Sequence, residues 1–315
     1  MRIKQDSAGG PGETPVFQRA LVALALSPHL PAVLNHSCHI LKPLGAEAVF
    51  LHVGPNTAAA RQRLGAAIAA SAFSGGPEPR LIIQPGQPVE VIAATARSEH
   101  ADLIVAGAPK KESLLRHFLG SVAAQLAAVT PCSLLLMTDP AVTPEPIFRV
   151  HCAVEYDRPA HFAVRVAITL ARYLHSRELV LTHSFRAPEW EKTPPQGAMT
   201  ETRRYYHRQD LRLKRFLSRF PSQGVSCRAQ CFQEQTVNST LAFARDVNAN
   251  LLVLPSSRRQ NGVWDRLLKN NLNNLLQALP EAILLTRKPR YRVHRPSAPP
   301  AGDKKKPVSV LRKQA

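Results

Sequence analysis

"ADLIVAGAPKKESLLRHFLGSVAAQLAAVTPCSLLLM", residues 101–137, carries the clearest evidence for the fold of the chain. An apolar strand runs into a glycine, a polar loop follows, and Gly-Ser stands at the head of a helical stretch. A Pro-Cys then precedes a second apolar strand. Continuous apolar strands separated by helices are typical of a parallel sheet that is covered on both faces. The stretch therefore predicts an α/β protein.

A second copy of the same pattern lies further along the chain. "ANLLVLPSS" at 249–257 echoes "ADLIVAGAP" at 101–109, and each leads through a polar and a helical stretch to a Pro and an apolar strand. Upstream, "GAEAVFLHV" is matched by "SRELVLTHS". Because the matching segments begin at residues 101 and 249, the repeat is far longer than a solenoid unit, and we expect each copy to be a domain. The linker between the copies is "TDPAVTPEP" at 138–146, with three prolines.

Strands and helices alternate within each copy. In the first copy we expect strands 19–26, 46–53, 80–84, 102–107 and 132–138, and helices 30–43, 57–72, 88–99 and 117–129. In the second we expect strands 147–154, 177–184, 225–232, 250–255 and 281–287, and helices 159–174, 199–220, 237–247 and 266–278. This order predicts two tandem doubly wound parallel five-stranded sheets. The expected units are a disordered leader (1–15), two domains (16–139 and 147–290) and a basic disordered tail (291–315).

The positive charge is concentrated in the second half. Of the net +19, residues 1–145 carry +1, residues 146–286 carry +9 and residues 287–315 carry +9. Such asymmetry favours an anionic partner without saying which one. No run of about 18 apolar residues and no secretory signal is visible, so we expect a cytoplasmic protein without a transmembrane segment.

The segment 80–138, with its Gly107, Gly120-Ser121 and Pro131-Cys132, resembles the universal stress proteins. The resemblance implies a strand order of 3-2-1-4-5 and a ligand crevice between the first and fourth strands of each copy. It also implies association through the last strands, 132–138 and 281–287, which in a fused chain makes an internal pseudo-dimer. Whether the chain also forms a homodimer is left open.

ATP-binding members of that family carry an Asp after the first strand and Gly-x2-Gly-x9-Gly-Ser/Thr after the fourth. In the first copy Gly107 and Gly120-Ser121 match, Lys110 replaces the second glycine, and Ala25 stands at the Asp position. Glycines allow close backbone approach to phosphate, and a helix N-terminus supplies free N–H groups. The candidate phosphate-binding residues are therefore Gly107, Lys110, Gly120 and Ser121. Helix packing and capping explain the same residues, so ATP in the first copy stays an alternative.

The second copy departs further from the pattern. Pro255 and Arg258 stand at the two glycine positions, and Lys269-Asn270 replaces Gly-Ser, while Glu155 follows the first strand. Proline offers no N–H to a phosphate, so ATP is not expected in the second copy. Two loop arginines and a lysine are candidates for another anion: Arg258, Arg259 and Lys269.

The stretch "TETRRYYHRQDLRLKRFLSRF" at 200–220 is the most basic helix of the chain. Five arginines at spacings of four, four, three and four residues form one stripe, which we name the arginine row: Arg204, Arg208, Arg212, Arg215 and Arg219. The opposite face, with Leu213 and Phe216, should pack on the sheet. A row of like charges weakens an isolated helix, which favours an anionic partner such as nucleic acid, an acidic protein or anionic lipid over a merely solvated face.

No catalytic motif is present. The sequence lacks a GxSxG elbow, a GxxxxGK[ST] loop and any His/Cys cluster at metal spacing, and its five cysteines are scattered. We therefore predict no catalytic residue and no metal. The predicted function is that of a non-catalytic stress-response or regulatory protein that acts by binding. The alternatives are a nucleotide sensor or slow ATPase, and a nucleic-acid-associated protein that works through charge.

Overall fold

The computed structural model of the 315-residue chain describes residues 16–73, 79–108, 121–185, 198–233, 239–256, 280–289 and 291. The first half contains β1 (Arg19–Leu24), α1 (Leu30–Leu44), β2 (Glu47–Val53), α2 (Ala58–Ala69), β3 (Arg80–Gln84), α3 (Pro88–Ser98), β4 (Leu103–Gly107), α4 (Ser121–Val129) and β5 (Ser133–Met137). The second contains β6 (Arg149–Ala153), α5 (Arg158–Tyr173), β7 (Glu178–Phe185), α6 (Ala198–Leu217), β8 (Cys227–Gln233), α7 (Ser239–Asp246), β9 (Leu251–Pro255) and β10 (Ala282–Thr286).

These elements lie where the sequence predicts them, and the expected helix 266–278 falls outside the described residues. The expected leader, and all of the expected tail except Tyr291, also fall outside them. Local chemistry explains several element ends. The hydroxyl of Thr57 accepts a hydrogen bond from the Ala60 amide (3.1 Å), and the carboxylate of Asp157 accepts one from Ala160 (2.9 Å), so both side chains cap the helices that follow them. Gly45 ends α1 in the left-handed conformation that glycine adopts without strain.

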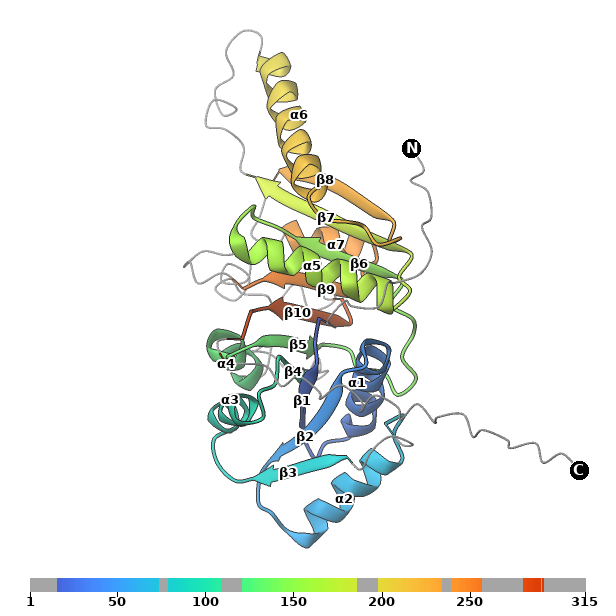
Figure 1. Cartoon of the computed structure of the whole chain (residues 1–315), viewed down its shortest axis with the longest axis vertical. Helices are drawn as coiled ribbons and strands as arrows, with labels where there is room; N and C mark the ends of the chain where they lie inside the picture. The colour runs from blue at the N-terminus through green and yellow to red at the C-terminus, as the bar shows by residue number, and fades with distance from the viewer. Residues whose placement is uncertain are drawn as a thin grey trace, which may run out of the picture.

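The ten strands form one continuous sheet in the order β3-β2-β1-β4-β5-β10-β9-β6-β7-β8 (Figure 1). Each half has the predicted order 3-2-1-4-5 with parallel neighbours, which confirms the predicted fold. The two five-stranded sheets are joined by antiparallel pairing of β5 with β10, in which Leu134 faces Leu285 and Leu136 faces Ile283. The last strands thus pair within one chain, as the family resemblance implies.

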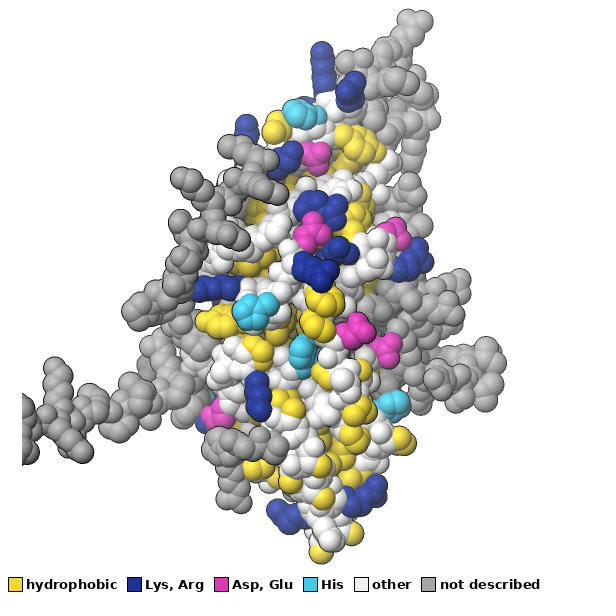
Figure 2. All heavy atoms as spheres, turned by 90° about the vertical axis from the view of Figure 1, so that its right-hand side faces the viewer, with side chains coloured by type: hydrophobic (Ala, Val, Ile, Leu, Met, Phe, Trp, Pro, Cys, Tyr) yellow, Lys and Arg dark blue, Asp and Glu magenta, His cyan; other side chains and the backbone are white. Residues whose placement is uncertain are grey.

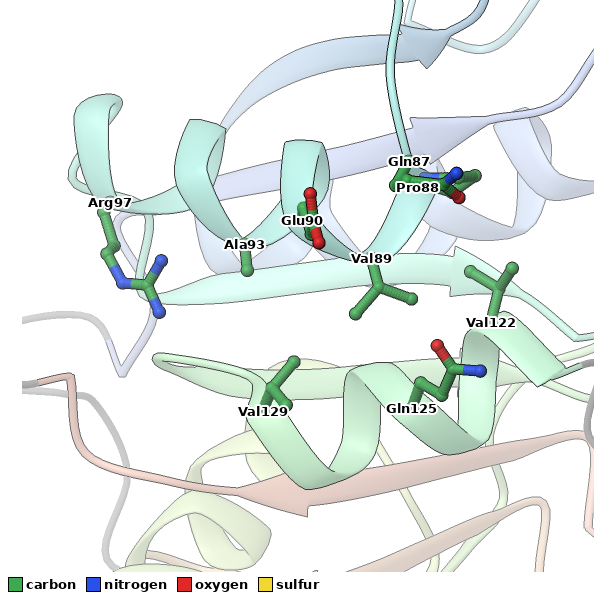
Figure 3. Close-up of a pocket in the computed structure, with 9 residues that line it drawn as sticks. All are labelled: Gln87, Pro88, Val89, Glu90, Ala93, Arg97, Val122, Gln125 and Val129. Atoms are coloured by element: carbon green, nitrogen blue, oxygen red, sulfur yellow. The ribbon is translucent and has the colours of Figure 1, made fainter.

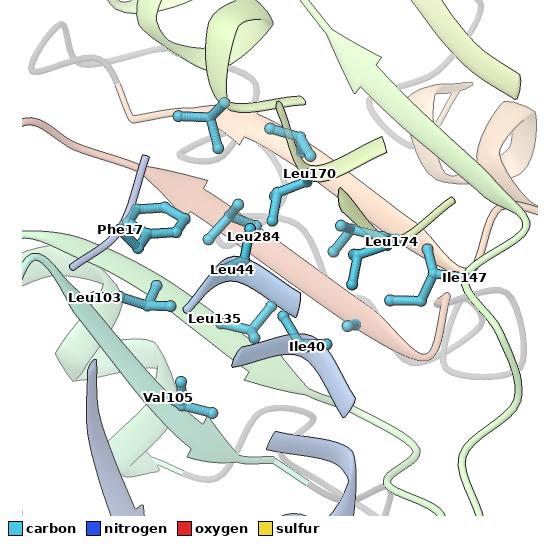
Figure 4. Packing of buried hydrophobic residues seen from close by; sticks show 14 of the residues in the cluster. Phe17, Ile40, Leu44, Leu103, Val105, Leu135, Ile147, Leu170, Leu174 and Leu284 are labelled. Carbon is cyan, nitrogen blue, oxygen red and sulfur yellow. The ribbon is translucent and has the colours of Figure 1, made fainter. Parts of the chain in front are cut away.

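The helices divide between the two faces of the sheet. Buried side chains of α1, α2, α5 and α6 pack on one face, and those of α3, α4 and α7 pack on the other. Both cores continue across the joint between the halves. Figure 4 shows this at the joint, where Leu135 of β5 and Leu284 of β10 lie among side chains of both halves, such as Ile40 and Leu170. Burial of this apolar surface on both sides makes the two halves one packed body.

The duplication is visible in repeated contacts at the start of each half. Arg19 pairs with Glu47 (2.8 Å) on β1 and β2, and Arg149 pairs with Glu178 (3.1 Å) on β6 and β7. The backbone amide of each arginine donates to a side chain at the start of the fourth strand of its half, Asp102 in one case (3.2 Å) and Asn250 in the other (3.2 Å). The two halves are therefore structural copies.

Candidate functional site

The carboxyl ends of β1 and β4 form the edge of the first half where the predicted crevice lies. Ala25 directly follows β1, Gly107 ends β4, and the two strands are neighbours with Ala23 beside Ala106. Both Ala25 and Gly107 are exposed. Ser121 is the first described residue of α4, and the residues before it lie outside the described part of the chain. Lys110 and Gly120 lie outside the described residues, so the phosphate cradle as a whole remains a prediction.

The corresponding edge of the second half lies at the ends of β6 and β9. Glu155 occupies the position of Ala25, two residues beyond the end of β6, and Pro255 ends β9 as a buried strand residue. The candidate anion-binding residues of the second half lie outside the described residues: Arg258, Arg259 and Lys269. This anion site therefore stays a prediction.

A histidine that the sequence analysis did not single out recurs at both edges. The Nδ1 atom of His52 on β2 lies 2.9 Å from the Leu24 carbonyl oxygen, and Nδ1 of His183 on β7 lies 2.9 Å from that of Val154. Each ring bridges the second strand of its half to the end of the first. The signal that could have found them is the repeated His in "FLHV" and "LTHS", at matching places of the two copies.

Tyr156 fills the space beside Glu155 in the second half. Its backbone is left-handed (φ +54°), a conformation that a bulky side chain adopts at a cost. Its ring lies 4.2 Å from that of His183 and 5.5 Å from that of Phe216, and the Arg212 guanidinium stands 4.4 Å from the ring centroid. Burial raises the pKa of the Tyr156 phenol well above its usual range. Tyr156, the residue after Glu155, is therefore packed against β7 and α6 by aromatic and cation–π contacts.

Helix α6 is fixed to the outer end of the sheet by its apolar face. Leu213 and Phe216 are buried in the core, as predicted. The Asp210 carboxylate accepts a hydrogen bond from the backbone amide of Cys231 (3.1 Å), and the Tyr206 hydroxyl donates to the side chain of Gln233. The Cys231 amide and the Gln233 side chain both belong to β8, the last strand of the sheet. Helix α6 therefore supplies hydrogen-bond partners to an edge strand.

The opposite face of α6 carries four members of the arginine row, Arg219 lies in the turn after the helix, and all five side chains are exposed. Among the described residues none of the five forms an ion pair. The nearest acid on the helix, Asp210, is turned toward β8 by its hydrogen bond to Cys231. Figure 2 shows Lys and Arg side chains at the top of the molecule, where α6 projects beyond the sheet in Figure 1. The structure thus places the five predicted residues along one side of α6 and the turn after it, without an ion pair to any of them among the described residues.

A groove lies between α3 and α4, on the face of the sheet opposite to α6 (Figure 3). It has a volume of about 650 Å³, and Val89, Ala93, Val122 and Val129 give it an apolar floor between the two helices. Glu90 and Arg97 stand along α3 at its side. Of the described candidate residues, neither Gly107 nor any member of the arginine row lines this groove.

The thiols of the described region are not set up as nucleophiles. All five cysteines are free, and burial raises the pKa of the Cys227 thiol to about 11 and that of Cys231 to about 12. A thiolate, rather than a thiol, attacks an electrophile, so these groups are unreactive near neutral pH.

The described residues contain no group of three or more His, Cys, Asp or Glu side chains arranged to hold a metal ion. Nor do they contain a helix long and apolar enough to span a bilayer.

Comparison with known proteins agrees with this picture. Residues 56–137 match the model of the universal stress protein family. A universal stress protein from Archaeoglobus fulgidus superposes with a TM-score of 0.60 at 15% identity, over 87% of this chain and 97% of that one. A protein of unknown function from Pseudomonas aeruginosa PAO1 (TM-score 0.61, 14% identity, 86% and 93% coverage) has the same fold. So does a universal stress protein from another P. aeruginosa strain (0.55, 15%, 86% and 94%). No curated protein matches the sequence.

Proposed function

We propose that this chain, whose first half carries a universal stress protein domain, is a stress-response protein that acts by binding rather than by catalysis. Its second half binds an anionic partner through the arginine row. The observation that carries the proposal is the exposure of all five arginines on one face of α6, without an ion-pair partner among the described residues. Unpaired surface charge of one sign raises the local concentration of ligands of the opposite sign.

The first half offers no comparable row and serves as an internal control. Helix α2 occupies the position of α6 in its copy, between the second and third strands, and carries only Arg61 and Arg63. The Arg61 guanidinium donates to the side chain of Asn56 (3.0 Å). Substitutions on α2 therefore remove two exposed positive charges from an equivalent helix without touching the arginine row.

The test is the salt concentration at which the full chain leaves an immobilised sulfated polysaccharide. A variant with all five row arginines changed to Gln should elute at clearly lower salt than the wild type, because fewer counterions are released on binding. The Arg61→Gln/Arg63→Gln variant, which has the same C-terminal segment, should elute close to the wild type. Equal elution of the row variant and the wild type would show that α6 is only a solvated face.

A second candidate function concerns the edge of the first half. Gly107 is exposed where β4 ends beside β1, at the carboxyl end of the sheet where the predicted phosphate cradle would lie. This supports ATP as a ligand of the first half, while Pro255, which has no N–H to offer a phosphate, argues against ATP in the second. Calorimetry with ATP should give saturable heat that Gly107→Val abolishes. Absence of heat from the wild-type chain at millimolar ATP would remove this candidate.

A further inference from the structure

Two members of the arginine row stand over aromatic rings. The Arg208 guanidinium lies 5.9 Å from the centroid of Tyr205, and Arg212 lies 4.4 Å from that of Tyr156. Tyr205 is only partly buried, and its ring is held edge-to-face by Phe185 on β7 at 5.5 Å. The two arginines are one helical turn apart, and each has an aromatic ring beside it: Tyr205 on the same helix and Tyr156 in the loop after β6.

The length of the row suits a chain of phosphates. At a rise of about 1.5 Å per residue, the eleven residue steps from Arg204 to Arg215, the last row member within α6, span about 16 Å along the helix axis. A nucleic-acid strand places one phosphate roughly every 3.4 Å of axis in a stacked duplex, so this part of the row covers about five nucleotide steps. Guanidinium groups also recognise phosphate through paired hydrogen bonds, which lysine cannot provide.

The burial pattern of α6 argues against a lipid surface. A helix that lies on a membrane inserts its apolar face between the lipids. The apolar face of α6 is already occupied, because Leu213 and Phe216 are buried in the core and Leu217 packs against it. The arginines therefore do not accompany a free hydrophobic stripe, and Leu211 is the one exposed large apolar side chain on the described part of the helix.

The aromatic rings distinguish among the remaining polyanions. An acidic protein surface and the outside of a duplex offer charge but no free base faces. In a single strand the bases are open, and they stack on tyrosine rings and on guanidinium planes. A partly exposed tyrosine fixed beside an arginine is the kind of contact that proteins use to bind single strands.

We propose that the α6 surface binds single-stranded nucleic acid, with the arginine row on the phosphates and the Tyr205–Arg208 pair stacking on a base. This inference rests on the proposed function, since it names the class of anion that the row takes. Sequence-independent binding is expected, because the surface presents stacking and charge rather than a pattern of base-edge contacts.

The test measures fluorescence anisotropy of the full chain with a labelled 12-nucleotide oligouridine, a duplex DNA of 12 base pairs and a labelled polyglutamate of similar charge. The wild type should bind the single strand at least tenfold more tightly than the other two. Tyr205→Leu keeps an apolar contact with Phe185 and should weaken single-strand binding roughly fivefold or more, because one stacked base is lost. Tyr205→Phe keeps the ring and should bind like the wild type.

The charge contribution is read from salt dependence. Arg204→Gln/Arg208→Gln should flatten the slope of log affinity against log salt for the single strand by about 1.4, since each phosphate contact contributes about 0.7. Arg61→Gln/Arg63→Gln should leave the slope unchanged. If Arg204→Gln/Arg208→Gln loses affinity for all three polyanions equally and Tyr205→Leu has no effect, the anion-binding function stands and the single-strand inference fails. If Arg204→Gln/Arg208→Gln binds every polyanion like the wild type, both fail.

Discussion

The buried carboxyl group of Asp102 makes the stability of the chain depend on pH in a direction opposite to that of most acidic residues. Asp102 begins the turn into β4 and is 6% exposed. Its two oxygens accept hydrogen bonds from the backbone amides of Gln18 (2.8 Å) and Arg19 (3.2 Å). Despite these bonds, burial raises the pKa of the Asp102 carboxyl from 3.8 to about 6. The desolvation cost of the charged form exceeds what the two amides return.

The sign follows from proton binding. Between about pH 4 and pH 6 the folded chain holds a proton on Asp102 that the unfolded chain has lost, so the free energy of unfolding falls as the pH rises through this range. For a group whose pKa moves from 3.8 to about 6, the loss between pH 4 and pH 7 is about 2.4 kcal/mol. Above pH 7 the contribution is constant, because the group is charged in both states.

The substitution Asp102→Asn removes this titration. The difference in unfolding free energy, variant minus wild type, should rise by about 2.4 kcal/mol between pH 4 and pH 7, whatever its value at pH 4. The offset itself reflects the hydrogen bond that an amide nitrogen cannot accept from Gln18 or Arg19. The second half supports the choice of Asn, because Asn250 stands at the matching position and its Oδ1 accepts from the Arg149 amide.

Urea denaturation at half-unit pH steps, followed by circular dichroism, gives both curves. Asn250→Asp is the matched counter-variant. It places a carboxylate where Asn250 now donates to Glu281 (3.0 Å), and it should add a slope of the same sign as that of Asp102. If wild type and Asp102→Asn keep a constant difference from pH 4 to pH 7, Asp102 does not titrate in this range and the reasoning is wrong.

Three further predictions concern packing and backbone. Leu284→Ala, at a side chain 1% exposed in the β5–β10 joint, should lower the free energy of unfolding by about 2–5 kcal/mol in urea and unfold both halves in one transition; two separate transitions would show that the halves are independent. Asp210→Ala should cost about 1 kcal/mol and speed hydrogen exchange of the Cys231 amide, while Asp246→Ala, an exposed acid, should change neither. Gly86→Ala should cost at least 1 kcal/mol, because Gly86 has φ +136° and a Cβ there would lie 2.8 Å from a methyl of Val91; a thermal melt equal to that of the wild type would contradict it.

The positions of the strands follow from the sequence because buried parallel strands are continuous apolar runs. "RALVAL" and "LLVLP" are such runs, and they became β1 and β9. The exposure of the arginine row and the burial of Leu213 follow equally from helical periodicity. The joining of β5 to β10 came from the family resemblance, since nothing local in "SLLLM" or "AILLT" specifies an antiparallel partner.

What the sequence does not give is the packing around Tyr156. Tyr156 lies beside Glu155 because its backbone is left-handed and because α6, some fifty residues later in the chain, brings Arg212 and Phe216 over its ring. Both conditions depend on contacts between distant segments, which periodicity and composition do not encode. The same holds for His52 and His183, whose roles appear only once β1 and β2, or β6 and β7, lie side by side.

The antiparallel joint between β5 and β10 has a geometric consequence for how the chain engages its ligands. All strands of one half run opposite to those of the other, so the carboxyl ends beside Gly107 and those beside Glu155 open on opposite edges of the same sheet. A small molecule at the edge beside Gly107 and a polymer along α6, at the far end of the other half, would not compete for space. Among the described residues, the packed core that crosses the β5–β10 joint is what connects the two proposed sites.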